Sequence, residues 1–270
     1  MPVSRDNFDE FWLENGSPLD YKKLFHKPLR EKENSRNTVA PFVSQAIVDH
    51  HLNRGRIADW LNKLGYVQTA SEIAANLPKD DRTRKGNFGE VIASEHLLQR
   101  QGYHMPVFKL RYRDSHNMPM RGEDIVAFIL TPQGKISKVC IGEAKTLTSF
   151  ASRTVLDAHD RLKKSYHPSP ETLSMLANIL YERGDDGLGR EIDRVSRLLA
   201  ERGIPTENWI FLITENEPRD PFAEIEKLED IIEPLICVDL QLSNLKVFVD
   251  DLFNNPKPCK DGVKNGRTRP

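Results

Sequence analysis

The chain has 270 residues, of which 38% are hydrophobic and 29% charged, a composition typical of a soluble globular protein with one large domain or two small ones. Its net charge of -1 excludes a uniformly basic nucleic-acid binder but not a local basic groove. No signal-peptide pattern opens the sequence, no apolar run approaches the roughly 20 residues that span a bilayer, and the cysteines are far apart. We therefore expect a reduced, cytoplasmic protein that does not enter a membrane.

The first 80 residues predict a helical and loop-rich extension. Residues 1–40 are polar and irregular, so we expect an ordered arm made mostly of loops. In 41–78 the apolar residues recur at helical spacing, with Gly65 as a plausible helix end before a second short helix. The adjacent His50 and His51 would diverge on a helix, which favours a surface position over a metal site. We interpret residues 1–80 as an N-terminal addition and a possible partner interface.

A helix and a basic segment are predicted next. The stretch "PKDDRTRKGN" is expected to be a loop, after which Asn87 can cap a helix that runs to about Gln101. The stretch "PVFKLRYR" (106–113) alternates apolar and basic residues. This alternation predicts a half-buried strand with Lys109, Arg111 and Arg113 on one face.

The following residues predict a β-hairpin and the rest of the core. "EDIVAFIL" (123–130) and "KISKVCIGEAK" (135–145) are strand-like and flank the turn signal "TPQG". The later elements, assigned from their periodicity, are helices at 150–165, 171–202 and 220–232 and strands at 208–214 and 235–240. This order predicts an α/β domain over 81–253, with a mixed sheet flanked by helices. Residues 254–270 have the composition of a flexible basic tail.

Two acidic residues mark the open end of the predicted hairpin. Asp124 opens its first strand and Glu143 lies near the end of its second, so we expect the carboxylates to be neighbours. Two close carboxylates repel each other unless a cation lies between them, and Mg²⁺ binds carboxylate oxygens readily. Lys145 shares the face of Glu143, and Glu90 on the preceding helix supplies a third acid. A metal, carboxylates and a lysine are what phosphodiester hydrolysis by an activated water needs.

Basic residues around these acids predict contacts with a phosphate backbone. The candidates for the DNA backbone are Lys85, Arg111, Arg113 and Arg121, in a groove to which Arg82, Arg84 and Lys109 also contribute. An acid-x-Lys triplet alone is common by chance, and "RKGNFGE" alone could be a basic loop and a helix start. The joint order of helix Glu, strand-start Asp, hairpin and Glu-x-Lys favours the catalytic interpretation.

These residues resemble a known group of nucleases. Glu90, Asp124 and the triplet Glu143-Ala144-Lys145 are similar to the core motif of the PD-(D/E)xK nucleases, which implies a restriction-endonuclease-like core. The stretch "RKGNFGEVIASEHL…KLRYRDSHNMPMRGEDIVAF…IGEAKT" resembles the HamA family, the nuclease subunits of the Hachiman anti-phage defence system. The resemblance implies a bacterial DNase held in check by a helicase partner until foreign or damaged DNA is sensed.

The resemblance leaves one ligand assignment open. The superfamily name implies Pro before the motif Asp, whereas Glu123 precedes Asp124 here and is a rival metal ligand. Strand alternation sends the two side chains to opposite faces, so only one can share the face of Glu143.

We expect a DNase dependent on Mg²⁺ or Mn²⁺. Glu90, Asp124 and Glu143 would bind the metal, and Lys145 would position the water. Two alternatives stay open: a catalytically inactive nuclease-fold subunit that binds DNA or acts as a scaffold, and a metal-dependent RNase. No nucleotide-binding fingerprint occurs in the sequence, so any ATP use is expected to belong to the partner.

Overall fold

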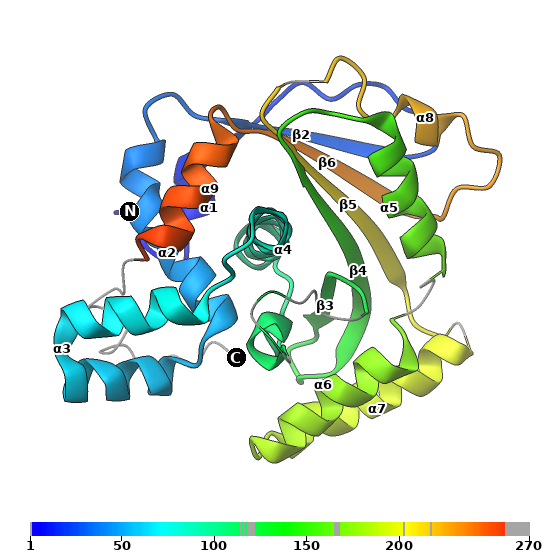
Figure 1. The fold of residues 1–270 in the computed structure, drawn as a ribbon. Helices are drawn as coiled ribbons and strands as arrows, with labels where there is room; N and C mark the ends of the chain where they lie inside the picture. Colours follow the sequence, from blue (N-terminus) through cyan, green and yellow to red (C-terminus); the bar gives the residue numbers. More distant parts are fainter. Residues whose placement is uncertain are drawn as a thin grey trace.

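The computed structural model describes residues 2–113, 115, 117, 122–164, 168–201, 203–216 and 218–256. Within them lies a mixed sheet with helices on both faces (Figure 1). The strands are β1 (Leu13–Asn15), β2 (Phe25–Glu31), β3 (Ile125–Leu130), β4 (Ile136–Leu147), β5 (Thr206–Thr214) and β6 (Leu235–Gln241). They are ordered β1-β2-β6-β5-β4-β3; the four inner strands are parallel, and β1 and β3 pair antiparallel at the edges. The predicted α/β class is confirmed.

Helices cover the two faces of this sheet. They are α1 (Phe8–Trp12), α2 (Arg36–His51), α3 (Arg54–Asn76), α4 (Asp81–Arg100), α5 (Ser152–Lys164), α6 (Pro170–Glu182), α7 (Asp186–Ala200), α8 (Ala223–Glu226), α9 (Leu245–Asn254) and the 3₁₀ helix η1 (Lys109–Tyr112). Figure 1 shows α4 in the hollow of the curved sheet, with α1, α2 and α9 beside it, and α5 across the sheet from it. Among the described residues, no helix is both long and apolar enough to cross a membrane.

The core consists of two layers, one on each side of the sheet. On β4, Cys140 and Ala144 pack in the layer that includes α4, whereas Val139 and Ile141 pack in the layer that includes α5, α6 and α7. Successive strand residues point to opposite faces, so Glu143 continues the face of Ile141. The charged end of β4 therefore faces α5.

The helix that carries Glu90 begins earlier than expected. Asp80 caps α4 by accepting a hydrogen bond from the Thr83 backbone N–H at 2.8 Å, so most of the expected loop before Asn87 is helical. Arg84 is buried in its first turns, where Nε donates to the Pro78 carbonyl at 2.9 Å and Nη2 to Asn254 Oδ1 at 2.8 Å. Arg84 thus anchors α9 to α4.

The predicted strand at 106–113 is wrong. Residues 107–110 are buried in an unbroken run rather than in alternation, and 109–112 form η1. The edge of β3 is bridged instead by His104, which exchanges backbone hydrogen bonds of 2.7 and 2.8 Å with Phe128. The segment therefore passes over the edge of the sheet without joining it.

Several N- and C-terminal expectations also differ from the structure. The arm within residues 1–40 contributes β1 and β2, and β2 pairs with β6 in the sheet. The helix expected at 220–232 is the single turn α8, and α9 follows the last strand where no helix was expected. Gly65 does break α3, because its φ of +74° is not helical.

The histidine pair of α2 is buried, contrary to the surface position expected. His50 Nε2 lies 2.8 Å from Glu95 Oε1, and its ring stacks on Phe108 with 3.8 Å between centroids. His51 Nδ1 lies 2.7 Å from the Ile47 carbonyl oxygen, to which it can donate. Arg5 reaches the same Glu95 carboxylate with two bonds of 2.5 and 2.6 Å, so a buried ionic network ties the N-terminal segment to α2 and α4.

Candidate active site

The β3–β4 hairpin brings Asp124 beside Glu143. The ladder pairs Ile125 with Gly142, so the next residues outward, Asp124 and Glu143, lie across from each other. Asp124 Oδ2 accepts a hydrogen bond from the Ala144 backbone N–H at 3.0 Å. This bond holds the Asp124 carboxylate against the end of β4.

Two cations meet the Glu143 carboxylate, which is only 2% exposed. Its Oε2 lies 2.8 Å from Lys145 Nζ and 3.3 Å from Arg161 Nη1. Burial, assisted by the charge of Asp124, raises the pKa of Glu143 to about 7 against the attraction of both cations. Sequence reasoning missed Arg161 because α5 must fold back over β4 before the two side chains can meet.

Glu90 lies on α4 at the edge of this group. The helix packs very close to β4 at Gly89, where a Cβ would stand 2.3 Å from Thr146 Oγ1. Burial raises the pKa of Glu90 to about 8; nearby Lys109 and Arg113 oppose the change, and Asp124 and Glu143 add to it. The negative charges of both hairpin acids therefore act on the Glu90 carboxyl.

Glu123 points away from this group. Its Oε1 accepts from the Ser169 backbone N–H and its Oε2 from Thr172 Oγ1, both at 2.8 Å. Gly122 makes this possible, because its φ of +85° suits glycine and a Cβ there would stand 2.4 Å from Thr172 Oγ1. Glu123 binds the first turn of α6, so Asp124 is the acid that faces Glu143.

Comparison with known proteins adds to this geometry. The HamA family model matches residues 6–253, which include both layers of the fold and the whole hairpin. The chain belongs to the HamA family. The Hachiman protein HamA of Bacillus cereus is 27% identical over 259 residues, which cover 94% of this chain and 91% of that protein.

The basic residues predicted to contact the DNA backbone in this HamA-family chain differ from one another in their surroundings. Lys85 is half-buried on α4, and Arg113 donates from Nε to the Leu110 carbonyl at 3.1 Å while attracting Glu90. Arg111 donates from Nε to the Asp49 carbonyl at 2.7 Å, and burial lowers its pKa to about 10. Arg121 lies outside the described residues. Arg113 therefore stays near the acids, whereas Arg111 joins η1 to the end of α2.

The acids offer suitable ligand atoms for a divalent cation. Carboxylate oxygens are what Mg²⁺ and Mn²⁺ prefer. Burial raises the pKa of Glu90 and of Glu143 despite the cations nearby. Within the described ranges, no three His, Cys, Asp or Glu side chains are grouped closely enough to hold a metal ion. The donor chemistry fits a metal, and binding would require the carboxylates to draw together.

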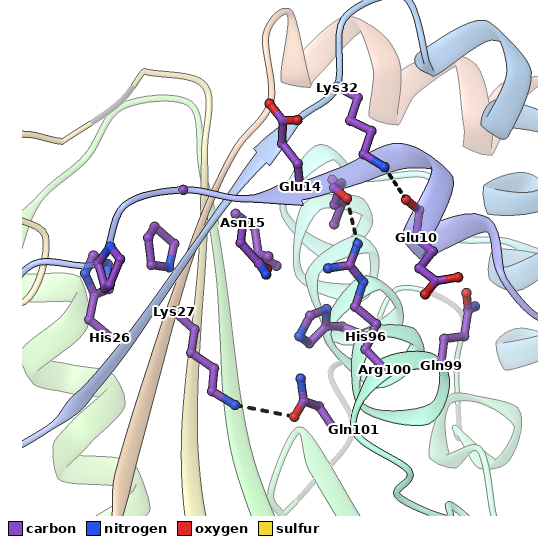
Figure 2. Close-up of a pocket in the computed structure, with 15 residues that line it drawn as sticks. Glu10, Glu14, Asn15, His26, Lys27, Lys32, His96, Gln99, Arg100 and Gln101 are labelled. Atoms are coloured by element: carbon purple, nitrogen blue, oxygen red, sulfur yellow. Dashed lines mark hydrogen bonds between the residues drawn. The ribbon is translucent and has the colours of Figure 1, made fainter.

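A separate cavity of about 750 Å³ lies between β2 and the C-terminal end of α4. Figure 2 shows Lys27 and Arg100 pointing into the space between these elements. Lys27 Nζ donates to Gln101 Oε1 at 3.4 Å and lies 4.7 Å from the centroid of the Trp209 ring. No candidate residue of the active site lines this cavity in the described part of the chain.

Proposed function

We propose that this HamA-family chain is a metal-dependent deoxyribonuclease that acts in Hachiman anti-phage defence together with a helicase partner. The observation that supports hydrolysis most directly is the meeting of Asp124, Glu143 and Lys145 at one end of β3 and β4. The Hachiman name of the Bacillus cereus relative supports the defence role. The helicase partner rests on the resemblance of the motifs.

Each residue has a definite role in this proposal. Asp124 and Glu143 would hold the ion directly, and Glu90 at the edge of the group would bind the waters around it. The ion, when bound, supplies charge neutralisation and a lowered pKa for a coordinated water. Lys145 would orient the attacking water and balance charge on the phosphate. Its Nζ is already held 2.8 Å from Glu143 Oε2, which keeps the ammonium at the site.

One observation favours a second candidate function. Lys145 and Arg161 already meet the Glu143 carboxylate, as they would in a nuclease fold that serves only to bind DNA or to act as a scaffold. In such a protein the acids would be dispensable and only the basic surface would matter.

Cleavage of plasmid DNA with Mg²⁺ separates the candidates. We expect wild type to cut DNA alone or with its partner, and Asp124→Ala and Lys145→Ala to lose at least 100-fold in rate, a typical cost for a group that acts in the transition state. Lys163→Ala is the control, because Lys163 is an exposed lysine that pairs with Asp230. Normal cleavage by Lys145→Ala contradicts the proposal. So does a wild type that cuts no DNA either alone or with its partner. A parallel RNA substrate tests the RNase alternative.

A further inference from the structure

Helix α5 covers the face of the sheet to which Glu143 and Lys145 point. It packs against β4 and β5 through its buried residues Val155, Ala158, His159 and Leu162. Its last turn carries Arg161, Lys163 and Lys164, all of them exposed. Of these three cations, Arg161 is the one that an ion pair places at the site.

Arg161 differs from the other cations of this helix. Its Nη1 lies 3.3 Å from Glu143 Oε2, the same oxygen that Lys145 Nζ approaches, and its side chain is still 53% exposed. Arg153 pairs with Asp157 one turn along the surface, at 2.8 Å. Lys163 pairs with Asp230. Among these cations of α5, Arg161 is thus the one that contacts the Glu143 carboxylate while its side chain remains exposed to solvent.

We propose that Arg161 binds a phosphate of the DNA backbone at the active site, and that the DNA enters over α5. This inference rests on the proposed function, since it assigns the substrate-binding side of the same site. A guanidinium is planar and offers five N–H donors, which suits two oxygens of one phosphate. On binding DNA, Arg161 exchanges the Glu143 carboxylate for a phosphate and leaves that carboxylate to the metal.

The basic residues on the other side of the sheet fit this role less well. Arg84 is buried against α9 and Arg111 is bound to the end of α2. Both lie on the α4 side, whereas the side chains of Glu143 and Lys145 project toward α5. Arg161 therefore lies on the same face as Lys145, where both approach one oxygen of Glu143.

Binding of a labelled DNA duplex to the full chain, measured by fluorescence anisotropy in EDTA over a range of salt concentrations, tests the inference. Arg161→Ala should weaken binding and reduce the slope of log K against log salt by about 0.9, the value for one lost phosphate contact. Arg161→Lys should have the wild-type slope but only part of the wild-type affinity, because a lysine ammonium lacks the planar guanidinium that binds two oxygens of one phosphate. Arg153→Ala, on the same helix, should match wild type.

The test distinguishes this inference from the proposed function. An Arg161→Ala variant with the wild-type slope and affinity overturns the inference, even where wild type cleaves DNA with Mg²⁺. A wild-type chain that binds no duplex at any salt also overturns it. A reduced slope in a chain that never cleaves supports the phosphate contact while the nuclease proposal fails. Thermal unfolding of each variant shows that the fold is intact, as the exposure of Arg161 leads us to expect.

Discussion

Replacing Glu90 by glutamine should stabilise the metal-free protein at alkaline pH. The site raises the pKa of this carboxyl from 4.5 to about 8, chiefly by burial, against Lys109 and with help from Asp124. Between these two pH values the unfolded chain has lost its proton while the folded chain keeps it. Wild-type stability therefore falls as pH rises through this range, and the contribution is complete only below 4.5.

The size of the effect follows from the two pKa values. A change from 4.5 to about 8 corresponds to about 5 kcal/mol, at 1.36 kcal/mol per pH unit. Glu90 keeps some contact with solvent, which screens its charge, so we expect about 2 kcal/mol. Glutamine has the same shape but does not ionise, so Glu90→Gln should gain this amount over wild type as pH passes from below 4.5 to above 8.

Urea denaturation followed by circular dichroism, in EDTA and at several pH values, measures this difference. Glu182→Gln is the control, because Glu182 is an exposed glutamate on α6. The advantage of Glu90→Gln should grow with pH and then level off. A difference independent of pH, or one that shrinks as pH rises, would refute the idea that Glu90 is destabilised by burial beside the hairpin acids.

Three further predictions test the packing and charge of the fold, the first two by the same urea denaturation and the third by thermal unfolding. Gly89→Ala should lower the free energy of unfolding by about 1–3 kcal/mol because the added Cβ meets β4. Gly86→Ala is the control: its Cβ meets nothing within 4 Å and should stabilise α4 by about 1 kcal/mol. Equal effects of the two changes would refute the close packing of α4 on β4 at Gly89. Arg5→Met should cost about 3–5 kcal/mol because it leaves the buried Glu95 without its two bonds from the guanidinium, and a neutral result would show that the N-terminal segment is not docked. Burial raises the pKa of Glu191, but hydrogen bonds from a lysine, an arginine and a backbone N–H lower it to about 2. Glu191→Gln should therefore lower the melting temperature at neutral pH, with a loss that disappears as pH falls from 4.5 to about 2; a loss that persists in acid would refute the charge assignment.

The hairpin end of the site could be predicted because its determinants are local in the sequence. Two apolar runs around a turn signal define the pairing of β3 with β4. The pairing places Asp124 beside Glu143, and strand alternation places Lys145 on the face of Glu143. Alternation separated Glu123 from Asp124 but left the choice between them open. The bonds of Glu123 to α6 show that Asp124 is the acid on the face of Glu143.

The features that escaped prediction depend on segments far apart in the chain. Arg161 meets Glu143 only once α5 packs on the sheet, and no local pattern distinguishes it from Lys163. The β2 sequence "FHKPLRE" is polar and contains a proline, so its place beside β6 could not be inferred from periodicity. His50 is buried because Glu95 and Phe108 enclose it. In each case a tertiary contact outweighs the local pattern.

Calorimetric titration with Mn²⁺ tests the central claim most directly, because the account assigns Asp124 and Glu143, but not Glu123, to the metal. Wild type should bind Mn²⁺, Asp124→Asn should bind at least tenfold more weakly, and Glu123→Gln should retain wild-type affinity. Circular dichroism of each variant confirms folding. Absence of Mn²⁺ binding in wild type, or a loss in Glu123→Gln with wild-type affinity in Asp124→Asn, would contradict the assignment.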